Sequence, residues 1–245
     1  MSTLKATTIE PATGTNVTLG TTGDTVALPG NTLALDTWKD SGGNTLFTSN
    51  GSGTVSSVNA GLAGAGPVLI QSQTSSGSAS IEFTTGIDST YDKYMFVFLD
   101  INPSSNGENF FFNASDDGGS TYSVSKTTTF FRAKNTESGT APESGILAYQ
   151  AGGDLANSTS AQVLASGVGG AADESCAGIL YLFAPSSTTY VKQFYSILTD
   201  YQAGAIFDVG YMAGYINVTT AINALKFNFG GGTIANGTIK LYGVK

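Results

Sequence analysis

The chain has 245 residues, with 32 glycines, 14 phenylalanines, 11 tyrosines and no histidine, and only 11% of it is charged. Ordinary globular chains carry about 25% charged residues, so the polar surface here must come mainly from Ser, Thr, Asn and Gly. The net charge is −8 and only ten residues are basic. A nucleic-acid binder needs clustered Lys and Arg, so we expect no nucleic-acid partner. No apolar run is long enough to span a bilayer, so we expect no membrane insertion.

The absence of histidine restricts the chemistry open to the chain. Ser-His-Asp and Cys-His catalysis and ordinary zinc sites all need this residue. Cys176 is the only cysteine, which excludes an intrachain disulfide and favours a small buried side chain in a strand. We therefore expect no enzyme, no catalytic residue, no cofactor and no metal ion.

Paired carboxylates are the one enzymatic mechanism left open, because glycoside hydrolases use two Asp or Glu residues. The candidates are Asp100, Glu108, Asp116, Asp117, Glu143, Asp173, Glu174, Asp200 and Asp208. Most lie beside Gly, Ser or Asn, where a solvated turn residue is expected. Nothing in the sequence pairs any two of them, so a polysaccharide hydrolase is the weakest of the alternatives.

Residues 1–66 contain few bulky side chains, and their apolar residues alternate with polar ones. The alternating pairs are Val17 and Leu19, Val26 and Leu28, and Leu33 and Leu35. Gly- and Asn-rich turn signals separate these pairs, which predicts very short strands. One copy cannot bury enough surface to offset its chain entropy. Either this segment is a flexible polar arm or several chains share one core, and the alternation favours an intertwined trimeric stalk.

A glycine-rich stretch, Gly61–Pro67, follows the predicted stalk. A phosphate-binding loop would need a preceding strand and a following helix. Here Pro67 and the strand-like run Val68–Ile70 follow instead. The stretch therefore predicts a hinge between an attachment and trimerisation stalk, 1–66, and a second domain, 67–245.

The second domain carries nearly all the bulky side chains. Ala79, Ile81 and Phe83 alternate with polar residues, which predicts a strand with one wet face. Four further runs are continuously apolar and predict strands covered on both faces: residues 94–99, 110–112, 179–183 and 194–198. Many short strands with turn signals at this spacing predict an all-β fold, and a jelly-roll β-sandwich suits the length.

The last strand is predicted from the alternation near the C-terminus. Ile239 and Leu241 should share a buried face, while Lys240 and Tyr242 point the other way. The pair Asn236-Gly237 is either a turn or a bulge within this strand. The strand should close the sandwich.

The segment Ser115–Tyr122 is the sharpest local motif. It resembles the Asp-box, Ser-x-Asp-x-Gly-x-Thr-Trp, with Tyr122 in place of Trp. In families that carry it, the box is a hairpin-stabilising turn away from the catalytic centre. Asp side chains accept bonds from nearby backbone N–H groups, and Gly adopts positive φ. We therefore predict a β-hairpin in which Asp116, Gly118 and Gly119 act in folding.

Three tyrosines around a Gly-rich stretch, Tyr201, Tyr211 and Tyr215, are the candidate glycan contacts. Aromatic faces stack on sugar rings, and hydroxyl groups bond sugar hydroxyls. The same tyrosines equally suit strand edges and subunit interfaces. Both interpretations stay open, and the second is the more general expectation.

Three stretches resemble virion proteins of tailed bacteriophages, marine phages especially. Gly20–Pro29 and Ser41–Phe47 are similar to repeat-like segments of phage fibre and virion structural proteins. Ile234–Val244 looks like the closing strand of a jelly-roll domain in such proteins. The resemblance implies a homotrimer mounted on the particle, with other virion proteins as partners, and it implies no catalytic residue.

Composition and resemblance agree on a location in the virion. The composition is typical of an extracellular protein, yet residues 1–8 lack the apolar core of a signal peptide. Virion proteins reconcile these features, because they are made in the host cytoplasm and exposed after lysis. We expect a capsid decoration or head fibre that adheres to host surface glycans, with a tail fibre or receptor-binding spike as the alternative. A fully extended stalk of 66 residues spans at most about 3.3–3.6 Å per residue. A long tail fibre needs greater reach, so the stalk length favours attachment to the capsid.

Overall fold

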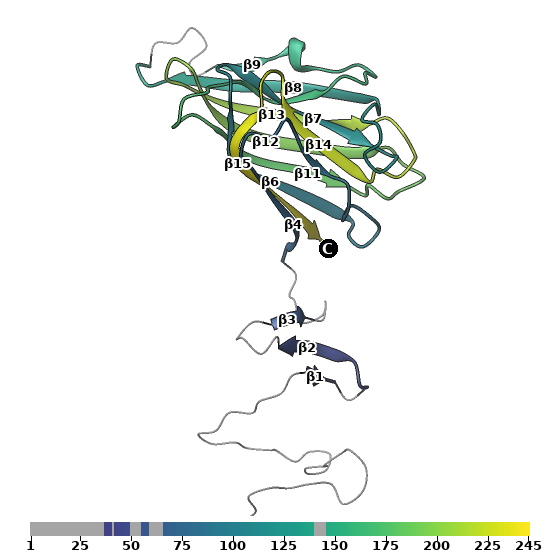
Figure 1. Cartoon of the computed structure of the whole chain (residues 1–245). Coiled ribbons are helices and arrows are strands. Elements are labelled where there is room, and N and C mark those ends of the chain that lie inside the picture. Colours follow the sequence, from purple (N-terminus) through teal and green to yellow (C-terminus); the bar gives the residue numbers. More distant parts are fainter. Residues whose placement is uncertain (1–36, 41, 50–54, 59–65, 140–145) are drawn as a thin grey trace, which may run out of the picture. The chain divides into compact units, whose positions relative to one another are not determined.

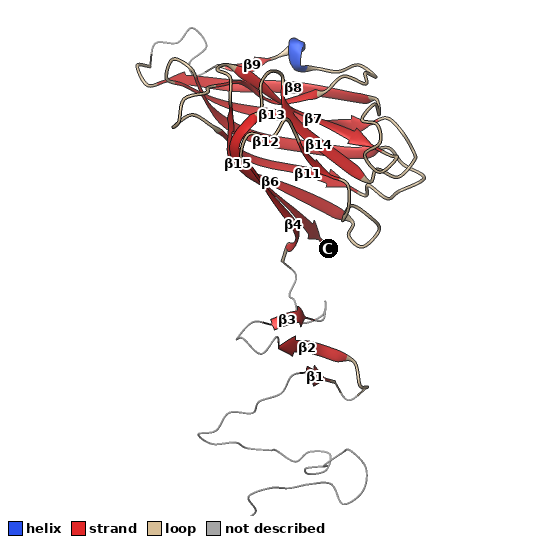
Figure 2. Ribbon diagram, viewed as in Figure 1, coloured by secondary structure: helices blue, strands red, loops and turns tan. Residues whose placement is uncertain are grey.

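The computed structural model describes residues 37–40, 42–49, 55–58, 66–139 and 146–245, and it is drawn in Figures 1 and 2. The chain divides into two compact units, residues 1–64 and 65–245, whereas the sequence placed the division between residues 66 and 67. The alternating pairs from Val17 to Leu35 lie outside the described residues. The trimeric stalk therefore stays a prediction.

The described part of the first unit is a small antiparallel sheet. Its three strands, in the order β1-β2-β3, are β1 (Thr37–Lys39), β2 (Thr45–Ser49) and β3 (Val55–Val58). The ring of Trp38 stacks on Phe47 with 5.5 Å between ring centroids. The Asp40 carboxylate accepts hydrogen bonds from the backbone N–H groups of Gly42 and Asn44 and closes the β1–β2 turn. Trp38 is 39% exposed, because the three described strands form a single layer, which cannot cover both faces of the ring.

The described residues of the second unit form twelve strands and one short 3-10 helix, η1 (Ala151–Gly153). The strands are β4 (Val68–Ser75), β5 (Ile81–Phe83), β6 (Lys93–Pro103), β7 (Glu108–Ser115), β8 (Lys126–Thr136), β9 (Leu147–Tyr149), β10 (Gln162–Val168), β11 (Cys176–Phe183), β12 (Lys192–Gln202), β13 (Ile206–Ile216), β14 (Ala224–Phe229) and β15 (Ile234–Val244). Within the described ranges, no helix is long and apolar enough to cross a membrane.

The twelve strands are hydrogen-bonded into one antiparallel sheet, which divides into two parts that we call the large sheet and the small sheet. The large sheet has the order β9-β8-β13-β12-β11-β6-β15-β4, and the small sheet has the order β10-β7-β14-β5. One pair of residues, Val168 of β10 and Gln202 of β12, connects them. Eight of the strands form two groups of four, in the orders β4-β15-β6-β11 in the large sheet and β5-β14-β7-β10 in the small sheet. This is the jelly-roll connectivity, so the prediction of an all-β jelly roll is confirmed. The strands β8, β9, β12 and β13 extend the large sheet beyond β11.

Aromatic rings fill the space between the sheets. Phe227 of the small sheet is fully buried and lies 5.3 Å and 5.2 Å, between ring centroids, from Phe96 and Phe98 of the large sheet. In the last strand, Ile239 and Leu241 are fully buried, as the alternation predicted. The Asn236-Gly237 pair is a bulge within β15 rather than a turn.

The continuous apolar runs are covered on one side only. Their inward members, such as Phe96, Leu180 and Phe194, are buried in the core. Leu99 and Tyr195 point to the other side, and each keeps 38% of its surface exposed. The described residues of one chain therefore do not supply the cover on both faces that these runs predicted.

The Asp-box-like segment does not form a hairpin, which corrects the sequence prediction. The strand before it, β7, pairs with β10 and β14 in the small sheet, and the strand after it, β8, pairs with β13 and β9 in the large sheet. The segment thus carries the chain from one sheet to the other. A tight turn is encoded locally, but the choice of strand partners is not.

The internal bonds of the segment also differ from those predicted, because Asp117 organises the turn. The Asp117 carboxylate accepts hydrogen bonds from the Ser115 hydroxyl (2.6 Å) and the Thr121 backbone N–H (2.9 Å). These bonds lower the pKa of Asp117 to about 2. The neighbouring Asp116 instead accepts a bond from the Thr220 hydroxyl and ties the segment to the loop between β13 and β14. In the box pattern, the aspartate is the third residue, which is Asp117.

The two predicted glycines have the expected backbone conformation. Gly118 and Gly119 have φ of 75° and 88°, a region that L residues with side chains rarely adopt. A Cβ atom at Gly119 would also lie 2.7 Å from the Cγ2 of Thr84. Position 119 therefore requires glycine for two separate reasons.

Candidate binding face of the large sheet

Four strands of the large sheet present an uncharged, aromatic surface away from the core. We call the outward side chains of β11, β12, β13 and β8 the outer face. Successive residues of a strand point to opposite sides, so the register aligns residues of the outer face into rows. One row consists of Ile179, Ile197, Tyr211 and Phe131. No outward position of these four strands, all of them within the described ranges, carries a charged residue.

The rings of the outer face gather in two groups. Tyr195 lies 5.2 Å from Tyr181 and 5.9 Å from Phe183, between ring centroids. Phe131 stacks on Tyr211 at 5.1 Å with an interplanar angle of 10°. These groups flank a hollow of about 180 Å³, which we call the central hollow. It is lined by Phe131, Tyr195, Ser196, Ile197, Tyr211, Met212 and Ala213.

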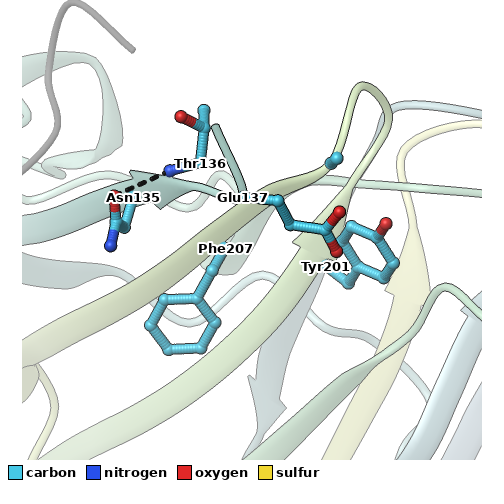
Figure 3. A pocket seen from close by; sticks show the side chains of 6 residues that line it. Asn135, Thr136, Glu137, Tyr201 and Phe207 are labelled. Atoms are coloured by element: carbon cyan, nitrogen blue, oxygen red, sulfur yellow. Dashed lines mark hydrogen bonds between the residues drawn. The ribbon is translucent and has the colours of Figure 1, made fainter. Parts of the chain in front are cut away.

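A second depression, the terminal hollow, lies at the tip of the β12–β13 hairpin and has a volume of about 400 Å³ (Figure 3). It is lined by Asn135, Thr136, Glu137, Tyr201, Ala205 and Phe207. The Glu137 backbone N–H donates to the Ala205 carbonyl at 3.2 Å, which fixes the end of β8 beside the hairpin. The Thr136 backbone N–H donates to the Asn135 side chain at 2.9 Å. Two segments far apart in the sequence thus build one site.

The terminal hollow combines aromatic surface with hydrogen-bonding groups. Figure 3 shows the Glu137 side chain extending to the Tyr201 ring. The negative charge of Glu137 is the main reason why the pKa of Tyr201 is raised. The Phe207 ring is half exposed and therefore open to a ligand. Rings beside an amide and a carboxylate suit a ligand with an apolar face and several hydroxyl groups.

The three predicted glycan contacts all lie on the outer face, but the structure does not bring them together. Tyr201 lies in the terminal hollow and Tyr211 in the central hollow. Tyr215 pairs with Gln193 and Thr127, beyond the central hollow. A ligand as small as one sugar ring cannot contact all three.

Sequence reasoning found only Tyr201 of the terminal hollow and missed its other five lining residues, among them Asn135, Glu137 and Phe207. A signal for Phe207 was present, because it follows Tyr201 across the turn-forming stretch Ala203-Gly204-Ala205. A short turn there makes Tyr201 and Phe207 register partners. The approach of Glu137 had no local signal, since it depends on the pairing of β8 with β13.

Two groups of the carboxylate candidates come together in the structure. Asp100, Asp173 and Glu174 line a hollow of about 330 Å³ together with Asn102 and Asn236. The other group is the pair Asp200 and Asp208, which are register partners. Both are buried on the inner side of the sheet. Arg132 forms a 3.3 Å ion pair with Asp208, and Gln202 donates to Asp208 at 2.9 Å. Burial, and then the charge of Asp208, raises the pKa of Asp200 to about 8. A polymeric substrate has no access to Asp200 and Asp208, so they form a structural cluster.

The chain matches no protein-family model, no curated protein and no solved structure. Across the described residues, no group of three or more His, Cys, Asp or Glu side chains could hold a metal ion.

Proposed function

We propose that the chain is a virion surface protein, of the capsid-decoration or head-fibre type, that binds neutral host glycans through its terminal hollow. Residues 1–66 are its attachment and trimerisation segment in this proposal. The observation that carries the binding function is the placement of the Tyr201 and Phe207 rings beside Asn135 and Glu137 in one open hollow. The location in a virion is supported by the jelly roll, the low content of charged residues and the resemblance of three sequence segments.

The chemistry of the hollow selects the class of ligand. Its volume of about 400 Å³ lies within the range of roughly 300–1,000 Å³ that is usual for small-ligand sites. Sugar rings have an apolar face that stacks on Phe207 or Tyr201. The Asn135 amide and the Glu137 carboxylate can accept hydrogen bonds from sugar hydroxyls. The Glu137 charge repels acidic sugars, and the net charge of −8 does the same at longer range, so the ligand is neutral or amino-substituted.

A glycan-binding experiment tests this function. The full-length chain is applied to an array of neutral, amino and acidic oligosaccharides, and each hit is measured in solution by titration calorimetry. We expect binding to neutral or amino sugars, weakened about tenfold by Phe207→Ala, because the stacked ring contributes on the order of 1.4 kcal/mol. The matched control is Tyr190→Ala, which removes a 73% exposed ring from a loop outside the hollow. Binding that is absent, restricted to acidic glycans or equally weakened by both variants would overturn the proposal.

The virion location has its own test. Antibodies against residues 67–245 should label the capsid of intact particles, and the protein should be present in purified particles at a fixed ratio to the capsid protein. Labelling of the tail would move the protein to the fibre or spike class. Absence from purified particles would refute a virion protein of either kind.

A further inference from the structure

The outer face exposes more contiguous apolar surface than a free-standing sheet should. Phe131 and Tyr195, on either side of the central hollow, are 36% and 38% exposed. At the β9 edge, Leu147 and Tyr149 are exposed as well. Monomeric soluble proteins rarely expose large contiguous apolar patches, and such patches mark interaction sites. The apolar runs that include Ile179 and Tyr195 independently predicted strands covered on both faces.

The distribution of charge allows a second copy of the chain to be the partner. The chain carries a net charge of −8, so two copies repel each other over most of their surfaces. The outward positions of β11, β12, β13 and β8 are the exception, because they carry only apolar, aromatic, hydroxyl and amide side chains. Depletion of charge with enrichment of Tyr and Phe is also the composition of the core of protein–protein interfaces. A like-charged second copy can therefore approach over this surface.

The central hollow fits an apolar side chain better than a sugar. Its walls are the rings of Tyr195, Tyr211 and Phe131, and Ala213 lies between them. Two of its other lining residues, Ser196 and Met212, have side chains buried toward the core. A sugar would leave most of its hydroxyl groups without partners there, which is costly. In a two-fold contact the same patch of each copy meets the other, so one patch must carry both protrusions and a matching hollow. The outer face meets this condition, because its protruding rings lie beside the central hollow.

From these observations we infer that the part of the outer face around the central hollow docks against a second copy of this chain, with protruding rings of one copy in the central hollow of the other. The contact is separate from any association through residues 1–66. Phe207 lies six residues from Ala213 along β13, or about 20 Å at ~3.4 Å per residue. The terminal hollow therefore lies away from the centre of the contact and stays open to glycans.

Two variants with the same change in charge test the inference in the full-length chain. Ala213→Glu places a carboxylate at the centre of the outer face, at an exposed position that tolerates it in the single chain. Ala156→Glu places the same group at an exposed position of the loop between η1 and β10. Hydroxyl-radical footprinting with mass spectrometry reports the solvent exposure of Tyr195 and Phe131, and light scattering reports the molar mass. The footprint gives an answer even if residues 1–66 hold chains together.

In the unmodified chain and in Ala156→Glu, Tyr195 and Phe131 should become protected as concentration rises, while the loop residue Tyr190 stays reactive. Ala213→Glu should shift the midpoint of this protection upward by about a hundredfold in concentration, because it buries a charge without a partner. If the outer face alone holds the copies together, the molar mass of the Ala213→Glu variant should be lower than that of the unmodified chain. Tyr195 and Phe131 that stay reactive at every concentration, or protection unaffected by Ala213→Glu, would overturn the inference.

Discussion

Tyr201 and Phe207 are register partners at the tip of the β12–β13 hairpin, and both rings line the terminal hollow. Gly204 and Ala205 have φ of 89° and 58°, and this conformation reverses the chain within a few residues. The bond from Glu137 to Ala205 then brings the end of β8 to the same tip. The backbone thus sets the spacing of the Tyr201 and Phe207 rings and places Glu137 beside them.

The first prediction concerns the charge in the terminal hollow. Glu137→Gln should lower the pKa of Tyr201, because the Glu137 carboxylate is the main cause of its elevation. Spectroscopic titration of the phenols, with Tyr201→Phe to assign the signal, measures the change. Asp92→Asn removes a carboxylate that does not act on Tyr201 and serves as the control. A Tyr201 pKa that is the same with Glu and Gln at position 137 would show that the two groups are apart.

The second prediction concerns the buried pair Asp200 and Asp208. Since the pKa of Asp200 is raised to about 8 in the folded chain, the folded state binds a proton that the unfolded state releases near pH 4. The free energy of unfolding should therefore fall between about pH 4 and pH 8, with Asp200 contributing at most about 1.4 kcal/mol per pH unit.

Asp200→Asn mimics the protonated side chain and removes this contribution. Denaturant unfolding of the two proteins across pH 4 to 8 gives the comparison. We expect the variant to be the more stable protein at pH 8 and the difference to shrink toward pH 4. A difference that does not depend on pH would show that Asp200 is ionised throughout.

The third prediction concerns the segment between β7 and β8. Gly118→Val should cost about 1–2 kcal/mol from its positive φ alone, because no other atom lies within 4 Å of the added Cβ. Gly119→Val should cost a further ~1–3 kcal/mol, since its Cβ also overlaps Thr84. Thermal unfolding of both variants separates the two effects. Equal losses would mean that the Thr84 and Tyr122 side chains move away from the added Cβ atom without cost.

This segment also shows how far the sequence could predict the fold. The residues that make a tight turn, Ser115, Asp117 and Gly119, are local and carry a recognisable spacing. Whether β7 pairs with β8 is decided by residues far along the chain, because β7 is flanked by β10 and β14. A hairpin was the natural local expectation, and long-range pairing overrode it.

The candidate site divides in the same way. Tyr201, which is half-buried, was predictable as an aromatic residue beside a turn, and Phe207 could have been found from the hairpin register. Glu137 could not be predicted from the sequence, because its position beside Tyr201 depends on the pairing of β13 with β8. Alternation correctly placed Ile239 and Leu241 in the core, since period-two patterns report burial directly. Continuous apolar runs are less informative, because they do not say whether the second cover comes from the same chain.

The last prediction concerns β15, which lies between β4 and β6 in the large sheet. Leu241 is fully buried, so Leu241→Ala should cost ~2–5 kcal/mol of unfolding free energy. Lys240→Ala, one residue away on the opposite face, should change stability by at most about 0.5 kcal/mol. Denaturant unfolding of both variants gives the comparison.

Removal of the whole strand should have a larger effect. A chain that ends at Thr233 lacks the partner of both β4 and β6, so β6 becomes an exposed edge and the core loses the cover of Ile239 and Leu241. Exposed apolar edges lead to aggregation, and we expect the shortened chain to be insoluble or to elute as aggregates from a sizing column. A shortened chain that stays soluble, with an unchanged melting temperature, would contradict the role of β15 in closing the sandwich. Equal stabilities of the Leu241 and Lys240 variants would contradict the burial of Leu241 in the core.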